Sequence, residues 1–207
     1  SAKPIDYSKP VFIQPKLDGV RCLIQCDNGV VTAYSRTGKQ WLNIEHIIKE
    51  LTPWFQNNKL CVLDGELYNH SFKDDFESII SMVRKTKPTD EDRLISAENV
   101  QFHCYDIIHP DAGVFSDRDS FIRNCLPTSY CVKHVAAWQV DESQAHFVHT
   151  ANLNNGYEGS IVRLDTVYQQ KRSHSLRKFK DFSDAEANIV GYEEGKGKRV
   201  GTLGKFI

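Results

Sequence analysis

The sequence lacks the features of a membrane protein, a disulfide scaffold or a fibrous chain. Its apolar runs fall far short of the roughly 20 residues that a membrane-spanning helix needs. No basic stretch followed by an apolar one opens the chain, so we expect no secretory leader. The six cysteines form neither a C-x-x-C pair nor a zinc-finger spacing, and we expect free thiols in a reducing compartment. These absences predict a cytoplasmic protein, or one of the host-cell cytoplasm if the source is a virus, with no membrane partner.

The composition is that of an ordinary globular protein. The 207 residues are 40% hydrophobic, 26% charged and 11% aromatic, which is enough to bury a core without cross-links. The net charge of −1 gives no whole-chain sign of a nucleic-acid partner. Residues 171–207, however, hold nine Lys or Arg and five Asp or Glu, a local charge of +4. This segment indicates a polyanion on one face, although a solvated lysine-rich tail accounts for it equally well.

Strand and helix patterns are interleaved along the chain. Residues 20–35 predict a hairpin, because Asn28-Gly29, two residues that tolerate positive φ, separates two strand-like runs. Further strand-like runs cover 10–15, 60–67, 100–108, 130–135, 159–164 and 175–180. Helical spacing or suitable caps predict helices over 43–56, 74–84 and 141–156. Because hairpins interrupt a strict strand–helix alternation, we predict the α+β class with mainly antiparallel sheets.

The end of the chain predicts the start of a second domain. Strand-like runs near 186–193 and 200–207 flank a basic Gly/Lys turn and should pair as a hairpin. No further strands follow that could complete a sheet around this pair. We therefore expect one domain over 1–182 and the first hairpin of an incomplete domain over 183–207.

Two motifs in the first third of the chain could carry phosphate chemistry. In Lys16-Leu-Asp-Gly-Val-Arg21, a lysine at a strand end can act as a nucleophile if its surroundings disfavour the ammonium form. Arg21 could hold a phosphate or a sugar oxygen. In Asp64-Gly65-Glu66, the glutamate could bind a sugar hydroxyl or a metal. If these motifs have no function, the first is a turn with a surface Lys–Asp pair, and the second is an ordinary Asp-Gly turn.

Three later motifs extend this set. Tyr105, in an apolar strand, could stack on a base, although an aromatic residue there more often belongs to the core. Glu158 begins a buried strand and could bind a divalent metal. Lys178 and Lys180 share one face of a strand, which suits a phosphate site better than a random charged strand, although a solvated sheet face accounts for them equally well. Together and in this order, the five motifs make a complete site for nucleotidyl transfer.

The same motifs resemble those of the covalent nucleotidyltransferases, the superfamily of ATP-dependent DNA ligases, RNA ligases and mRNA capping enzymes. The resemblance includes Ser-Arg-x-Gly-Lys at 35–39 and covers essentially the whole chain. The stretch 171–186, followed by Glu-Gly-Lys-Gly-Lys at 194–198, is similar to small ATP-dependent DNA ligases of bacteriophage and bacterial type.

This resemblance implies an ATP-grasp-like adenylation domain of two mainly antiparallel sheets with flanking helices, followed by the start of an oligonucleotide-binding (OB) fold. It implies that Lys16 attacks the α-phosphate of ATP and that AMP then passes to the 5′-phosphate of nicked double-stranded DNA. The implied nucleotide-binding residues are Gln14, Arg21, Arg36, Glu66, Tyr105, Lys178 and Lys180. The implied Mg²⁺ ligands are Glu66 and Glu158, and the implied DNA-binding residues are Arg36, Lys39, Lys196 and Lys198. We expect the protein to act as a monomer.

The resemblance has one gap. The OB domain is represented by about residues 184–207, and the family's basic C-terminal motif VI is absent. We therefore expect slow adenylylation and doubtful sealing activity from this chain. The alternatives are an RNA ligase, a GTP-dependent capping-type nucleotidyltransferase and a non-catalytic nucleic-acid-binding fragment.

Overall fold

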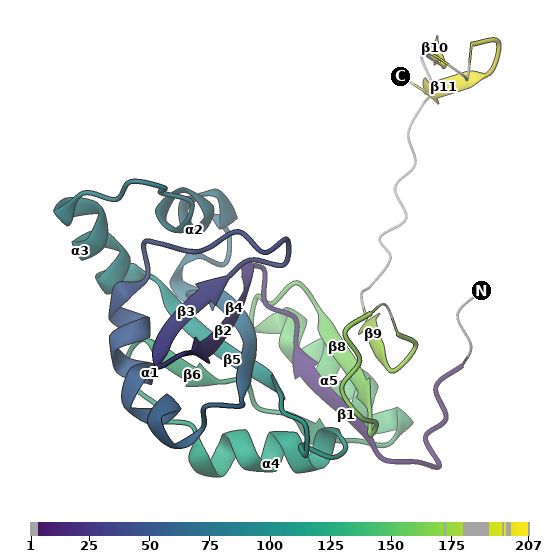
Figure 1. Cartoon of the computed structure of the whole chain (residues 1–207). Coiled ribbons are helices and arrows are strands. Elements are labelled where there is room, and N and C mark those ends of the chain that lie inside the picture. The colour runs from purple at the N-terminus through teal and green to yellow at the C-terminus, as the bar shows by residue number, and fades with distance from the viewer. Residues whose placement is uncertain (1–3, 172, 180–190, 196, 198–199, 207) are drawn as a thin grey trace.

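The fold rests on two β-sheets. The computed structural model describes residues 4–171, 173–179, 191–195, 197 and 200–206. The larger sheet consists of β2 (Val20–Asp27), β3 (Val30–Tyr34), β4 (Val62–Tyr68), β5 (Gln101–Ile108) and β6 (Val132–His134). The smaller sheet consists of β1 (Val11–Pro15), β7 (Trp138–Gln139), β8 (Ser160–Leu164) and β9 (Leu176–Phe179). Figure 1 shows the two sheets side by side, linked by the passage from β1 to β2.

The strand order explains why residues far apart in sequence meet. The larger sheet has the order β3-β2-β4-β5-β6 and the smaller one the order β7-β1-β8-β9. Neighbouring strands run antiparallel, except for the parallel pair β5–β6. The predicted α+β class and the mainly antiparallel sheets are therefore confirmed. β7 is a strand of two residues that the sequence patterns did not predict.

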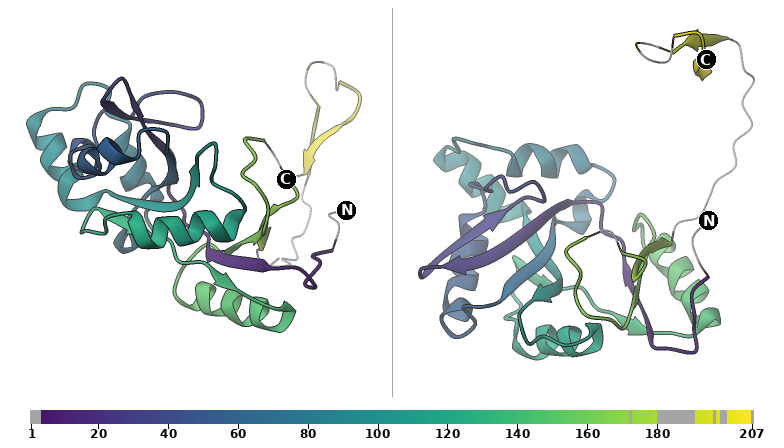
Figure 2. Two further views of the ribbon diagram at one scale, coloured as in Figure 1. Left: turned by 60° about the horizontal axis from the view of Figure 1, so that its bottom comes forward. Right: turned by 45° about the vertical axis from the view of Figure 1, so that its right-hand side comes forward.

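Helices cover one face of each sheet (Figure 2). They are α1 (Glu45–Asn57), α2 (Phe76–Val83), α3 (Asp90–Asn99), α4 (Phe115–Cys125) and α5 (Glu142–Asn154), with a 3₁₀ turn, η1 (His70–Phe72). Helices α1, α2 and α4 contribute to the core of the larger sheet, and α5 packs on the smaller one. In the part of the chain that the structure describes, no helix has the length and apolarity to cross a membrane.

The main core lies between the larger sheet and its helices. Leu63 and Leu67 of β4 and Phe102 of β5 have no exposed surface, and burying each such side chain contributes about 1.5–3 kcal/mol. Because successive side chains of a strand point to opposite faces, Asp64 and Glu66 must point away from this core. The larger sheet therefore presents a polar face on the side without helices.

The smaller sheet has the same division into two faces. Ile13 of β1 and Val162 of β8 pack with α5 in a second, smaller core. Their sequence neighbours Gln14 and Arg163 point to the other face, where Arg163 meets Asp106 of β5. The polar faces of the two sheets therefore face each other, and the candidate residues gather between them.

Several local predictions are confirmed. Asn28 and Gly29 have φ values of 49° and 81°, and they connect β2 to β3 as a tight hairpin. The helices predicted over 43–56 and 74–84 are α1 and α2, with ends displaced by one or two residues. Asp141 caps α5 through a hydrogen bond from the Gln144 backbone N–H (2.8 Å). All six cysteines are free, as expected.

The helices α3 and α4 were not predicted, because neither has an apolar stripe at helical spacing. Leu94 and Ile95, the two large apolar residues of α3, are exposed, and this helix begins at a capping box between Thr89 and Asp92. Helix α4 buries charged residues, among them Arg118. Both helices are fixed by capping and by polar contacts that hydrophobic periodicity does not detect.

The predicted C-terminal hairpin is present. β10 (Tyr192–Glu194) and β11 (Leu203–Phe206) pair antiparallel, with Tyr192 opposite Phe206. Residues 186–190 of the predicted first strand and the expected domain boundary at 182/183 lie outside the described residues. That this hairpin opens an OB barrel stays a prediction.

Candidate active site

Lys16 and Glu158 meet at the adjacent ends of β1 and β8. Because β1 and β8 pair antiparallel, the end of one strand lies beside the start of the other. The Lys16 backbone N–H donates to the Gly159 carbonyl (2.9 Å). The Lys16 side chain forms an ion pair with the Glu158 carboxylate. Both side chains are mostly buried, with 15% and 27% of their surface exposed, so solvent screens this pair only partly.

The turn after Lys16 requires a glycine. A Cβ atom on Gly19 would lie 2.4 Å from the Leu67 carbonyl oxygen and 2.7 Å from Cγ of Glu66. Only the absence of a side chain at Gly19 lets this turn lie against β4. This close approach brings the motif around Lys16 next to the motif around Glu66.

Arg21 is held in a fixed orientation by Asp64. Its Nε and one terminal nitrogen donate to the two carboxylate oxygens of Asp64, at 2.9 and 2.8 Å. The Tyr168 hydroxyl donates to Asp64 (2.6 Å) and accepts from Arg21 (3.0 Å). The Asp64 carboxylate raises the pKa of the Arg21 guanidinium, so Arg21 is a permanent cation beside the turn. Asp64 and Tyr168 are site residues that the sequence motifs had not identified as such.

Glu66 is a half-buried residue whose carboxyl lies near other acids. β-sheet pairing places it opposite Arg21 on one side and His103 on the other. Burial, followed by the nearby Asp64 carboxylate, raises the pKa of Glu66 from 4.5 to about 8. Because its charged form is disfavoured, a carboxyl of this kind is stabilised by a proton, a bound cation or hydroxyl donors. Glu66 therefore suits a sugar hydroxyl or a metal ion, the two roles expected from the sequence.

Tyr105 lies beside Glu66 because β5 contains a bulge. The pairing of β4 with β5 shifts between Asp64 and Gly65, so β5 has one residue more than its partner there. The Tyr105 hydroxyl lies close enough to Glu66 to lower the pKa of this carboxyl, against the larger effect of burial. The Arg163 guanidinium lies 5.4 Å from the centre of the Tyr105 ring. Tyr105 thus belongs to the space between the sheets and not to the main core.

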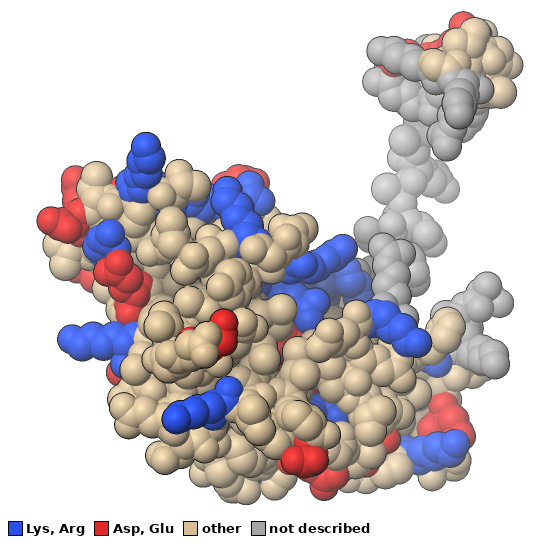
Figure 3. All heavy atoms as spheres, in the orientation of Figure 1, with Lys and Arg blue, Asp and Glu red and all other residues tan. Residues whose placement is uncertain are grey.

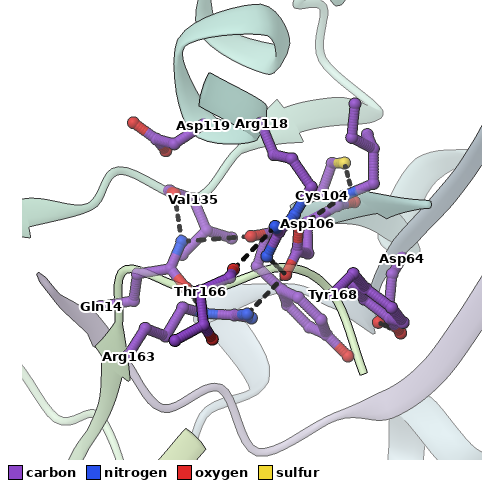
Figure 4. A network of polar contacts seen from close by, with 12 residues as sticks. Gln14, Asp64, Cys104, Asp106, Arg118, Asp119, Val135, Arg163, Thr166 and Tyr168 are labelled. Atoms are coloured by element: carbon purple, nitrogen blue, oxygen red, sulfur yellow. Dashed lines mark hydrogen bonds and ion pairs between the residues drawn. The ribbon is translucent and has the colours of Figure 1, made fainter. Parts of the chain in front are cut away.

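A buried polar network joins the two sheets behind these residues (Figure 4). Asp106 of β5 accepts from Arg118 of α4 (2.7 Å) and from Arg163 of β8 (2.6 Å). Arg163 also donates to the Gln14 amide oxygen (2.6 Å), and the Gln14 amide nitrogen donates to the Val135 carbonyl (2.9 Å). Breaking a buried pair of this kind costs about 3–5 kcal/mol, because it leaves a charge without a partner. Asp106, Arg118 and Arg163 carried no assigned role in the sequence.

Gln14 takes part in this network instead of pointing a free amide into the site. It is 1% exposed, and both ends of its amide are hydrogen-bonded within the protein. A contact between Gln14 and a base would therefore require one of these bonds to be exchanged.

The remaining predicted cations lie at the edge of the site or outside the described residues. Lys178 of β9 is exposed. It pairs with Ile161 of β8, and Ile161 pairs with Gln14 of β1. Because paired residues of neighbouring strands point to the same face of a sheet, Lys178 lies on the polar face of the smaller sheet. Arg36 and Lys39 are exposed in the loop after β3. Figure 3 shows Lys and Arg side chains gathered in the region where the two sheets adjoin. The predicted residues outside the described part are Lys180, Lys196 and Lys198.

The carboxylates fit a magnesium ion that is bound together with phosphates. Among the described residues, no group of three or more His, Cys, Asp or Glu could hold a metal by itself. Mg²⁺ usually retains waters and binds through one or two carboxylates together with substrate phosphates. Glu158 fits this role, because it is partly exposed and sits beside the candidate nucleophile.

Solved structures with a similar fold include DNA ligases. The structure named "Pmar-Lig_PreS3" matches with a TM-score of 0.77 at 24% identity, covering 96% of this chain and 48% of that one. A structure from a structure-function analysis of Lig E DNA ligases matches with a TM-score of 0.69 at 25% identity, covering 98% of this chain and 73% of that one. The fold is therefore that of ligase adenylation domains.

The sequence places the chain in one family. It is 27% identical over 224 residues to a DNA ligase of African swine fever virus (isolate Pig/Kenya/KEN-50/1950), covering 96% of this chain and 48% of the viral protein. The family model described as "ATP dependent DNA ligase domain" matches residues 5–180. The chain belongs to the ATP-dependent DNA ligase domain family, as its motifs had indicated. It spans about half the length of the viral relative.

Proposed function

We propose that this chain is the adenylation domain of an ATP-dependent DNA ligase, which forms lysyl-AMP on Lys16 and passes AMP to the 5′-phosphate of a DNA nick. The observation that carries this proposal is the pairing of Lys16 with Glu158 beside a polar face that holds Arg21, Glu66 and Tyr105. These residues come from four separate sequence motifs, in a chain of the ATP-dependent DNA ligase domain family. We further propose that the protein acts as a monomer in the cytoplasm.

The first chemical step forms a bond between Lys16 Nζ and the α-phosphorus of ATP. The P–O bond to pyrophosphate breaks, pyrophosphate leaves, and the amine loses a proton. Only the neutral amine can attack, whereas the Glu158 carboxylate favours the ammonium form. The ion pair must therefore loosen before attack. Mg²⁺ held at Glu158 would neutralise charge on the phosphates.

The later steps use the same space. An oxygen of the DNA 5′-phosphate attacks the phosphorus of lysyl-AMP, and Lys16 leaves as an amine. The 3′-hydroxyl then attacks the 5′-phosphorus, and AMP leaves as the strand is sealed. Arg21 and Lys178 suit the phosphate groups, Glu66 suits the ribose hydroxyls, and Tyr105 suits the base. We assign Lys180 to the phosphates with Lys178.

Intact-mass spectrometry after incubation with ATP and Mg²⁺ tests this proposal. We expect one added AMP, located at Lys16 by peptide mapping and absent from Lys16→Ala. GTP in place of ATP should give little adduct, whereas an adduct with GTP alone would indicate the capping-type alternative. DNA binding without any adduct would indicate the non-catalytic fragment. A nicked RNA duplex in place of nicked DNA separates an RNA ligase from a DNA ligase.

The proposed DNA contacts are cationic and should depend on salt. Arg36 and Lys39 are exposed in the loop after β3, and we assign Lys196 and Lys198 to the same DNA surface. Each lost phosphate contact should reduce the slope of log K against log salt concentration by about 1. We expect this reduction for Lys39→Ala in binding to a nicked duplex. Lys59→Ala is the control, because Lys59 is exposed at the other end of the larger sheet, just before β4.

A further inference from the structure

Arg163 contacts all three strands that carry the proposed reacting and base-binding residues. It lies in β8, which begins two residues after Glu158. Its Nε donates to the Gln14 amide of β1 (2.6 Å), two residues before Lys16. Its terminal nitrogen donates to Asp106 of β5 (2.6 Å), next to Tyr105. One planar guanidinium thus fixes the spacing between β1, β8 and β5 (Figure 4).

These contacts are rigid because every partner is itself held. Gln14 and Asp106 are each 1% exposed, and Arg163 is 7% exposed. Gln14 is held by Val135, and Asp106 by Arg118 and by the Ile107 backbone N–H (2.8 Å). With water excluded, no solvent molecule replaces these bonds if one is lost. A displacement of the Arg163 side chain would therefore displace β1 and β5, which it contacts through Gln14 and Asp106.

We propose that Arg163 is a positioning residue for nucleotidyl transfer, which holds Lys16 and Glu158 of the smaller sheet at the correct distance from the nucleotide on the larger sheet. This inference rests on the function proposed above. Arg163 does not touch the reacting atoms in this role. It acts through Gln14 on the strand that carries the nucleophile and through Asp106 on the strand that carries Tyr105.

This role predicts a specific kinetic signature. The base and the ribose should be bound by residues of β4 and β5, whereas the nucleophile directly follows β1. Loosening the link between the sheets should therefore slow lysyl-AMP formation at saturating ATP and leave the half-saturating ATP concentration unchanged. A misplacement of about 1 Å can cost about 100-fold in rate, so we expect a loss of about 10- to 100-fold.

The experiment measures single-turnover adduct formation by wild type, Arg163→Lys and Arg123→Lys, at a temperature where each is fully folded. Lysine keeps the charge of Arg163 but lacks the planar fork that donates to Gln14 and Asp106 from two separate nitrogens. Arg123→Lys is the control, because Arg123 of α4 pairs with Asp119 and takes no part in this network. We expect a slow Arg163→Lys and a near-normal Arg123→Lys. A wild-type rate for Arg163→Lys, or an equal loss in both variants, would overturn the inference.

A second variant keeps the test informative if Arg163→Lys does not fold. Gln14→Met removes the contact of Arg163 to β1, together with the bonds that the Gln14 amide nitrogen donates to the Val135 and Tyr105 carbonyls, and leaves the pair between Arg163 and Asp106. It should reproduce the loss of rate at an unchanged half-saturating ATP concentration, and a normal rate would overturn the inference. If wild type itself forms no adduct, the proposed function fails and this inference falls with it. An active wild type with active Gln14 and Arg163 variants refutes the inference alone.

Discussion

Lys16 and Glu158 lie 142 residues apart in the sequence, yet their side chains form an ion pair where β1 ends and β8 begins. In the proposed reaction, Lys16 attacks as a neutral amine, and a metal ion at Glu158 would take the place of the ammonium group. The ion pair therefore has to open before lysyl-AMP can form.

Replacing Glu158 tests this relationship. We expect Glu158→Gln to slow lysyl-AMP formation by about 100-fold or more, because the charge on the transferred phosphate is no longer neutralised through a metal at this position. The Mg²⁺ titration of adduct formation should also become weak and shallow. Glu142→Gln, at an exposed residue in the first turn of α5, is the control. An unchanged Mg²⁺ titration in Glu158→Gln would make the glutamate purely structural.

Glu66→Gln should stabilise the nucleotide-free protein at pH values above about 4.5, and most strongly at alkaline pH. The pKa of Glu66 is raised from 4.5 to about 8, so between these values the folded state holds a proton that the unfolded state has lost. Stability from this group is complete below pH 4.5 and falls as pH rises through 8, by up to about 1.4 kcal/mol per pH unit. Glutamine cannot ionise, so the variant does not lose this stability. Urea unfolding of wild type and variant at acidic and alkaline pH measures the difference in the free energy of unfolding. An equal difference at the two pH values would contradict the raised pKa.

Gly19→Ala should destabilise the fold and displace the turn after Lys16. The added Cβ would meet the Leu67 carbonyl oxygen at 2.4 Å, a backbone atom that cannot easily move. Overpacking of this kind costs about 1–3 kcal/mol, measurable by urea denaturation. Gly29→Asn is the control, because nothing lies within 4 Å of a Cβ there and asparagine tolerates positive φ. Equal stability of the two variants would show that the turn has room to relax.

Two variants of Tyr105 distinguish the contribution of its aromatic ring to ATP binding from that of its hydroxyl. Tyr105→Ala should weaken ATP binding by about 1–3 kcal/mol, the usual contribution of an aromatic ring stacked on a base. Tyr105→Phe keeps the ring and loses only the hydroxyl near Glu66, so ATP binding should be largely retained. Isothermal titration calorimetry with the three proteins measures both effects. ATP affinity that is unaffected by Tyr105→Ala would assign the ring to a packing role.

The sequence predicted well what depends on local pattern. The hairpin at Asn28-Gly29 follows from the backbone preferences of two residues, and the α+β class follows from hairpins that interrupt a strict strand–helix alternation. It could not predict the network of Asp106 and Arg163, because each is a lone charge in an apolar strand. Their pairing depends on the crossing of two sheets, which no local pattern encodes.

The bulge in β5 has a consequence for insertions and deletions in this strand. Cys104 and Ile107 both lie in the main core, so two successive residues between them, Tyr105 and Asp106, face the space between the sheets. A strand with strict alternation would send one of these two into the core. After deletion of a single residue here, only one of the two functions could be kept: either the aromatic ring of Tyr105 beside Glu66 or the carboxylate of Asp106 that binds Arg163. Length variation at this position is restricted by geometry, whatever the identity of the residues.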